Sequence, residues 1–120
     1  MQKEFVPYEL AVKLKALGFD EECFGAYHNE NYLDLQSEEF DYSYAVKAPL
    51  FQQAFRWFRE KGYRYTISFD SFMKNGMFYF EIWENGKCWF ETDFDYNTYE
   101  EAELACLEKL IEIVETQPNF

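Results

Sequence analysis

The sequence has few of the residues on which most catalytic and metal-binding motifs depend. Its 120 residues include one histidine, His28, and three cysteines. Cys23, Cys88 and Cys106 form no CxxC pair, and only Cys23 lies near His28 in the chain. A closed zinc site needs four nitrogen or sulfur ligands, and a cysteine nucleophile needs a neighbouring base. The sequence therefore predicts neither a zinc site nor a Cys–His catalytic pair.

Glycine is also scarce, and none of the five glycines belongs to a phosphate-binding loop. Each has a predicted structural place instead. Gly18 and Gly62 end helices, Gly25 lies in a strand, and Gly76 and Gly86 lie in turns. We therefore expect no cofactor.

Long apolar runs are missing as well. No segment approaches the roughly 18 consecutive apolar residues that a membrane-spanning helix needs. The first residues, Met1 to Glu4, contain no apolar signal-peptide core. The odd number of cysteines, without the spacing of a disulfide framework, indicates reduced thiols. These absences predict a cytoplasmic protein.

Basic residues are outnumbered, since 11 Lys and Arg face 23 Asp and Glu, and the net charge is −12. Such a field repels phosphate backbones and anionic membrane surfaces. We therefore expect no direct binding to nucleic acid and no membrane association. A basic protein, a cation or a site that normally holds nucleic acid is favoured as a partner. The alternative is that the acidity only keeps an aromatic-rich chain soluble.

Aromatic residues are abundant, with 14 Phe, 10 Tyr and 3 Trp, or 22% of the chain. This content excludes the disordered class despite the high charge. The length is that of one domain, so residues 1–120 are expected to fold as a single domain. A core of this size cannot hold all the rings, and some must lie at the surface.

Hydrophobic periodicity predicts an α+β fold in the order α-β-β-α-β-β-β-α. Strands joined by hairpins indicate an antiparallel sheet, and the amphipathic helices are expected to pack on its apolar face. Residues 37–47 are predicted to form a surface loop, with a short strand near 44–46 as the alternative. The predicted helices are 7–17, 49–61 and 98–115, and the predicted strands are 24–27, 32–35, 63–70, 78–83 and 87–92.

The sharpest local signal is Asn85-Gly86, which typically joins two antiparallel strands. A loop of only these two residues would place Glu91 opposite Phe80, among core residues. We therefore expect a three-residue loop, 84–86, closed by a bulge with Gly86 in the left-handed region. This register pairs Ile82 with Cys88, Phe80 with Phe90, and Phe78 with Thr92.

The hairpin is thus expected to have one apolar face, which includes Cys88, and one acidic, aromatic face. The acidic face is the predicted partner-binding surface, because Trp and Tyr are enriched at binding hot spots. Alternatively, residues 37–47 cover this face and its aromatic side chains are structural. Its carboxylates, Glu81, Glu91 and Asp93, also suit Mg²⁺, Ca²⁺ or acid–base chemistry. The predicted face consists of Tyr79, Glu81, Trp83, Trp89, Glu91 and Asp93.

Residues 48–116, a helix, three strands and a helix, resemble a double-stranded-RNA-binding domain in topology, with Asn85-Gly86 between the last two strands. In that family, basic residues at the start of the last helix grip phosphates. Here the matching segment, Tyr99–Glu103, is acidic. The resemblance implies the fold without the RNA function. Residual RNA binding is a weaker alternative, and the basic side chains for it are Arg56, Arg59, Lys61 and Arg64.

A second resemblance covers most of the chain. The segments Phe5–Leu10, Leu17–Glu21, Ala48–Lys61 and Tyr99–Leu107 are similar to a family of small uncharacterised proteins. That family is common in gut Bacteroides-group bacteria and in their phages or integrated elements. The resemblance implies a phage or mobile-element context and supplies no catalytic residues.

We therefore expect a non-enzymatic, acidic protein–protein interaction module of phage or mobile-element type. A nucleic-acid mimic or an inhibitor of a host factor is one form of such a module. The alternatives are a divalent-metal-dependent enzyme that uses the acidic sheet face, or a protein with a degenerate RNA-binding-like fold. Monomer and homodimer both stay open, because an open strand edge beside aromatic residues permits pairing.

Overall fold

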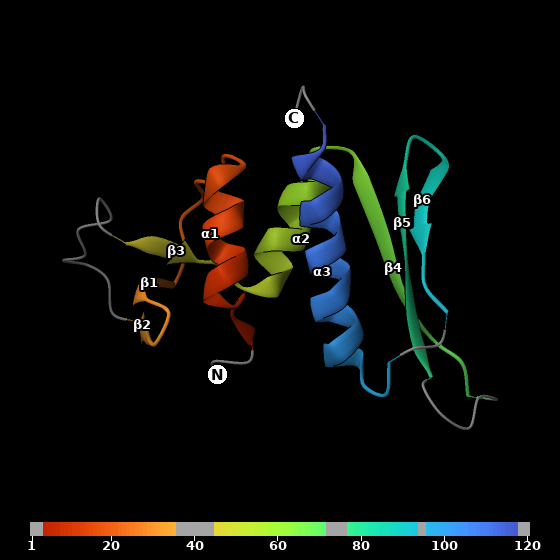
Figure 1. Ribbon diagram of the computed structural model, residues 1–120, viewed down its shortest axis with the longest axis horizontal. Coiled ribbons are helices and arrows are strands. Elements are labelled where there is room, and N and C mark those ends of the chain that lie inside the picture. Colours follow the sequence, from red (N-terminus) through yellow and green to blue (C-terminus); the bar gives the residue numbers. More distant parts are fainter. Residues whose placement is uncertain (1–3, 36–44, 72–76, 94–95, 118–120) are drawn as a thin grey trace. The chain divides into compact units, whose positions relative to one another are not determined.

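The computed structural model describes residues 4–35, 45–71, 77–93 and 96–117, and it confirms the α+β class (Figure 1). The predicted helices and strands follow one another in the predicted order, with one further short strand, β3, before the second helix. The strands form two three-stranded antiparallel sheets, with orders β2-β1-β3 and β4-β5-β6. The elements are α1 (Tyr8–Ala16), β1 (Gly25–Asn29), β2 (Tyr32–Asp34), β3 (Val46–Ala48), α2 (Phe51–Glu60), β4 (Tyr63–Phe69), β5 (Phe78–Glu84), β6 (Lys87–Glu91) and α3 (Tyr99–Glu115).

The chain divides into two compact units, each with one of the sheets. Unit 1 comprises Met1–Trp57 with Gln117–Phe120, and unit 2 comprises Phe58–Thr116. The division falls inside α2, so the last turn of that helix belongs to unit 2. Each unit has its own buried apolar side chains.

Helix α1 of unit 1 ends where the sequence predicts. Gly18 follows the helix with a φ of 103°, a left-handed conformation that glycine adopts at little cost. The Phe19 amide donates to the Leu14 carbonyl at 3.0 Å, and the Gly18 amide donates to Lys15 at 3.1 Å. These two bonds form a Schellman motif. They turn the chain back after α1, and Phe19 is buried.

The predicted hairpin of unit 1 is confirmed, with a shorter loop than expected. Strand β1 continues to Asn29, so only Glu30 and Asn31 connect it to β2. On its other side β1 pairs with β3, which begins at Val46, later than the short strand considered at 44–46. Most of the predicted loop, residues 36–44, lies outside the described residues. The Tyr27 hydroxyl donates to the Val6 carbonyl at 2.7 Å and ties β1 to the segment before α1.

Helix α2 has a broad buried apolar face. Trp57 is buried and meets Phe19 edge to face at 5.7 Å between ring centroids. The Leu50 amide donates to the Gln53 side chain at 2.9 Å, which gives the start of the helix a side-chain partner. The buried residues of α2 are Phe51, Ala54, Phe55, Trp57 and Phe58.

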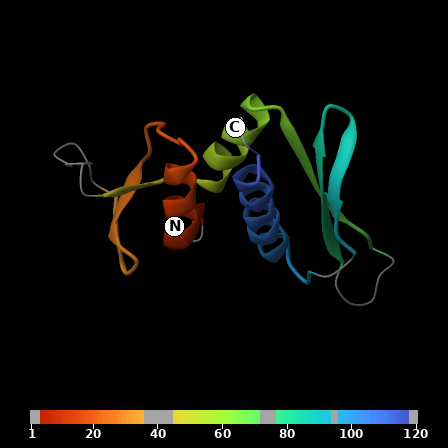
Figure 2. The same cartoon turned by 45° about the horizontal axis from the view of Figure 1, so that its top comes forward.

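In unit 2, helix α3 covers one face of the sheet β4-β5-β6 (Figures 1 and 2). Thr98 caps the helix, since its hydroxyl accepts from the Glu101 amide at 3.1 Å. Phe80 and Ile82 of β5 are fully buried. Lys109 of α3 lies 4.4 Å above the ring of Phe90, which pairs with Ile82. The even-numbered side chains of β5 therefore face the helix.

The predicted register of the second hairpin is wrong. Glu84 pairs with Lys87, so only Asn85 and Gly86 form the loop, and both have positive φ, 52° and 79°. Positive φ at both central positions is the signature of a type I′ turn, whose twist matches that of the flanking strands. Trp83 pairs with Cys88. The Glu84–Gly86 loop therefore does not form.

A β-bulge then corrects the register farther from the turn. The pairing shifts between Trp83 and Ile82, so that Ile82 lies opposite Phe90 and Trp89 is the extra residue. Phe80 now meets Thr92, whose hydroxyl accepts from the Phe80 amide at 2.9 Å. The bulge thus keeps a carboxylate away from Phe80, which is the problem that the three-residue loop was expected to solve.

No helix within the described parts of the chain is both long enough and apolar enough to cross a membrane.

The turn type has a measurable consequence at Asn85. In the type I′ turn this residue is left-handed, whereas in a three-residue loop it would be right-handed and would accept alanine easily. We expect Asn85→Ala to lower the free energy of unfolding by about 1–2 kcal/mol, measured by urea denaturation. The control Asn85→Gly should change it by less than about 0.5 kcal/mol. Equal stability of the wild type and Asn85→Ala would contradict the two-residue turn.

Candidate functional site

The candidate site is the outer face of unit 2, by which we mean the face of β4-β5-β6 opposite α3. The alternation of side chains along a strand places the odd-numbered residues of β5 here. The β4–β5 register places Ser68, Thr66 and Arg64 beside them. Strand β6 contributes Cys88, which pairs with Trp83, and Glu91, which pairs with Glu81. The face contains Arg64, Thr66, Ser68, Tyr79, Glu81, Trp83, Cys88 and Glu91.

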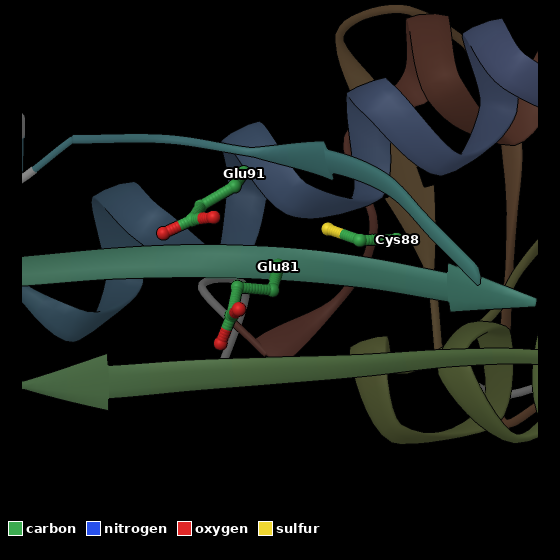
Figure 3. Close-up of side chains that lie close together, drawn as sticks. All are labelled: Glu81, Cys88 and Glu91. Atoms are coloured by element: carbon green, nitrogen blue, oxygen red, sulfur yellow. The ribbon is translucent and has the colours of Figure 1, made fainter. Parts of the chain in front are cut away.

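Two carboxylates and a thiol meet at the centre of this face. Glu81 of β5 lies directly opposite Glu91 of β6, and Cys88 lies nearby on β6. One ligand atom from each side chain lies within 4.8 Å of the other two (Figure 3). The Thr66 hydroxyl donates to Glu81 at 3.2 Å and draws that carboxylate toward β4. Among the described residues, this is the one group of three such side chains close enough to share a metal ion.

The tryptophans lie on either side of the turn and differ in their surroundings. Trp83 is half-buried between Arg64 and Cys88, its partners on the neighbouring strands. Trp89, at the bulge, is 37% exposed. Its indole nitrogen donates to Glu84 at 3.0 Å, and the Lys87 ammonium lies 5.0 Å from the centre of its ring. Trp89 is therefore held by residues beside the turn.

The structure gathers part of the predicted site and adds one residue. Tyr79, Glu81, Trp83 and Glu91 share the outer face, as the sequence predicts. Asp93 is exposed after the end of β6 and lies outside the central cluster, and Trp89 is bound at the turn. The sequence analysis placed Cys88 on the apolar face, which is wrong, because the two-residue turn pairs Cys88 with Trp83. The signal that identifies Cys88 is the preference of Asn-Gly for a type I′ turn.

Most of residues 37–47 lie outside the described residues, so the alternative that this segment covers the outer face stays a prediction. The described end of the segment belongs to unit 1, where Lys47 pairs with Ala26 of β1. The Lys47 ammonium binds the Asp20 carboxylate at 3.0 Å.

The basic side chains considered for RNA binding have partners within their own units. Arg56 forms an ion pair with Glu21 at 3.1 Å in unit 1. In unit 2, Arg64 donates to the Arg59 carbonyl at 2.9 Å. These contacts hold the cationic groups against the protein, which weakens the case for RNA binding.

A second set of titratable side chains lies on the α3 side of the sheet. Burial raises the pKa of Tyr65 on β4, and burial with the nearby charge of Glu103 raises the pKa of Tyr99. Burial, with a smaller contribution from Glu100, raises the pKa of the Glu103 carboxyl. Burial is the largest cause in each case, so these shifts follow from helix–sheet packing.

The three cysteines differ in accessibility. Cys88 is exposed, Cys23 is half-buried and Cys106 is buried. Burial raises the pKa of Cys23 to about 11, although Lys47 opposes the shift, and burial also raises the pKa of Cys106. Because the thiolate is the reactive and metal-binding form, Cys88 is the thiol available for chemistry.

Comparisons with known proteins found no match: no protein-family model fits the chain, and no curated protein and no solved structure is significantly similar to it.

We expect the three cysteines to react with iodoacetamide in a fixed order. A pKa of about 11 leaves Cys23 with only a small thiolate fraction near neutral pH. At mildly alkaline pH, Cys88 should be alkylated at least about 10-fold faster than Cys23, and Cys106 should react only on unfolding. Peptide mapping by mass spectrometry measures the rates, and denatured protein is the control in which the rates should converge. Equal native rates at Cys23 and Cys88 would contradict the predicted order.

Proposed function

We propose that this protein is a non-enzymatic interaction module whose outer face binds a basic surface of another protein. The apposition of Glu81 and Glu91 carries the proposal. These carboxylates are directly opposite on neighbouring strands, and like charges placed in this way destabilise a sheet. A cationic group from a partner removes this repulsion, so the isolated fold holds free energy that binding releases.

The chemistry around the two carboxylates suits an arginine-rich partner. A guanidinium can bond a carboxylate through two parallel hydrogen bonds, which fixes its orientation as well as adding affinity. Trp83 and Trp89 belong to the same hairpin as the two carboxylates, and a guanidinium can also stack on an indole ring. Carboxylates with nearby indoles are therefore favourable neighbours for an arginine that leaves water.

The net charge extends this preference over the whole protein. A chain of charge −12 is attracted to basic grooves, including those that normally hold nucleic acid. We propose that the partner is a nucleic-acid-binding protein and that binding competes with its nucleic acid. The resemblance to phage and mobile-element proteins supports a host factor as that partner and the cytoplasm as the place of contact.

A pair of double variants tests the proposed surface. Glu81→Gln/Glu91→Gln removes two charges from the outer face, whereas Glu108→Gln/Glu115→Gln removes two exposed charges from α3. Proteins captured from a bacterial lysate on each immobilised variant are identified by mass spectrometry, and the best partner is then purified. We expect the outer-face variant to bind it at least about 10-fold more weakly, which corresponds to about 1.4 kcal/mol. The α3 variant should bind like the wild type.

The same purified partner allows two further readouts. Because the attraction is ionic, its affinity should fall steeply as salt rises. Added nucleic acid should displace the partner if both use one groove. Equal binding of the partner by the two double variants would exclude the outer face. Insensitivity to salt and to nucleic acid would exclude mimicry while leaving the surface assignment intact.

A second candidate function is binding of a soft divalent cation, which the Glu81–Cys88–Glu91 cluster favours. Two carboxylates alone suit Mg²⁺ or Ca²⁺, but a thiolate among them shifts the preference toward Zn²⁺ or Cd²⁺. The three ligand atoms lie within 4.8 Å of one another. Bonds of about 2.0–2.3 Å to one zinc ion would bring these atoms closer together. Cys88 and Glu91 are exposed, and the Cys88 thiol, which donates to the Phe90 carbonyl at 3.6 Å, would exchange that contact for the ion. Three protein ligands would leave one position for water, as in catalytic zinc sites.

Calorimetric titration separates this candidate from the first. We expect one Zn²⁺ per chain to bind with release of a proton, because the thiol must ionise. Cys88→Ser should weaken binding at least about 10-fold, whereas Cys23→Ser, a change at a half-buried cysteine outside the cluster, should not. Unchanged Zn²⁺ binding by Cys88→Ser would show that the ion is held elsewhere or only by surface carboxylates.

A further inference from the structure

Unit 1 contains a cavity that the outer face of unit 2 does not involve. Its volume is about 90 Å³. Its wall comes from α1, from the turn that follows α1, and from the segment that enters β3. The lining residues are Ala11, Lys15, Phe19, Asp20, Ala45 and Lys47.

The inner wall of the cavity is apolar. Ala11, Phe19 and Ala45 are all buried, with exposed fractions of 1%, 5% and 4%. The Schellman motif at Gly18 brings Phe19 under the last turn of α1. The two alanines have short side chains, which leaves space beside the Phe19 ring. An apolar group placed here would be removed from water on several sides.

The mouth of the cavity is cationic. Lys15 is exposed, and within the described part of the chain no hydrogen bond or ion pair of its ammonium is seen. The Lys47 side chain is 23% exposed, and its ammonium bonds the Asp20 carboxylate at 3.0 Å and the Asp20 carbonyl at 3.2 Å. The Asp20 side chain is 90% exposed, so its carboxylate lies in water at the rim. Lys15 and Lys47 line the same cavity, so a ligand carboxylate that replaces that of Asp20 beside Lys47 also lies in the electrostatic field of Lys15.

The local charge decides which ligand is favoured. The protein as a whole repels anions, yet the residues that line this opening carry two ammonium groups and one carboxylate. An anionic head at the mouth and an apolar body against Phe19 match both parts of the cavity. One water-sized group needs roughly 10–15 Å³ of such space. The volume of about 90 Å³ therefore admits a body of only about six to nine heavy atoms.

We propose that this cavity binds a small organic carboxylate with a short apolar chain, its carboxylate between Lys15 and Lys47 and its chain against Ala11, Phe19 and Ala45. The site is independent of the proposed function of the outer face, since it lies wholly in unit 1. A ligand of this size makes few contacts, so we expect a dissociation constant of about 1 mM.

The test compares three probes of nearly the same shape: 3-methylbutanoate, the neutral 3-methylbutanamide and the cationic 3-methylbutylamine. Binding is followed by NMR through the methyl signals of Ala11 and Ala45. We expect saturable shifts with the carboxylate, affinity at least about 5-fold weaker with the amide, and no binding of the amine. Shifts absent at tens of millimolar carboxylate, or equal affinity for carboxylate and amide, would overturn the proposal.

A pair of lysine variants keeps the result specific to the cavity. Lys15→Gln should weaken 3-methylbutanoate binding about 5-fold, because it removes one of the two cations at the mouth. Lys13→Gln is the matched control, since Lys13 is exposed on the same helix and does not line the cavity. Both changes lie at exposed positions and should leave the fold intact. Equal weakening of 3-methylbutanoate binding by the two variants would show that only the net charge of the protein matters. That result would also overturn the proposed site.

Discussion

The strict alternation of side chains along strand β6 is the constraint on which the candidate site depends. A two-residue turn at Asn85-Gly86 would, by itself, bring Glu91 opposite the buried Phe80. One extra residue, Trp89, changes the alternation, so that Glu91 lies opposite Glu81. The bulge therefore allows the hairpin to keep its favoured turn and its apolar face together. The acidic pair on the outer face is a consequence of that solution.

The elements were predictable wherever their signals involve near neighbours in the chain. Gly18 ends α1 and Thr98 caps α3 because each acts on backbone groups within a few residues. The hairpin register was not predictable in the same way. A three-residue loop and a two-residue loop with a bulge both keep a carboxylate from Phe80, and the hydrophobic pattern does not distinguish them. The twist of the type I′ turn does.

The same distinction explains which site residues were predictable. Glu81 and Trp83 lie on β5, whose alternation is identical in both registers, and Glu91 lies beyond the bulge, where the two registers agree on its face. Cys88 lies between the turn and the bulge, and in this stretch the expected and the observed registers place a side chain on opposite faces of the sheet. The cavity in unit 1 is a different case. Lys15 and Lys47 come together because α1 packs against β3, a contact between distant parts of the chain without a local signal.

The Cys88 thiol adds a possible metal ligand to the Glu81–Glu91 pair, so the two proposed functions, partner binding and metal binding, would use the same carboxylates. Cys88 makes the cluster a suitable ligand set for a soft cation, which Glu81 and Glu91 alone would not be. A bound cation would neutralise the same two carboxylates that we propose as the contact for a basic partner. If both proposals hold, metal and partner would compete for one charge pair, and whichever binds first would lower the affinity for the other. Because such coupling is reciprocal, an outer face that holds zinc tightly would be a poor mimic of nucleic acid.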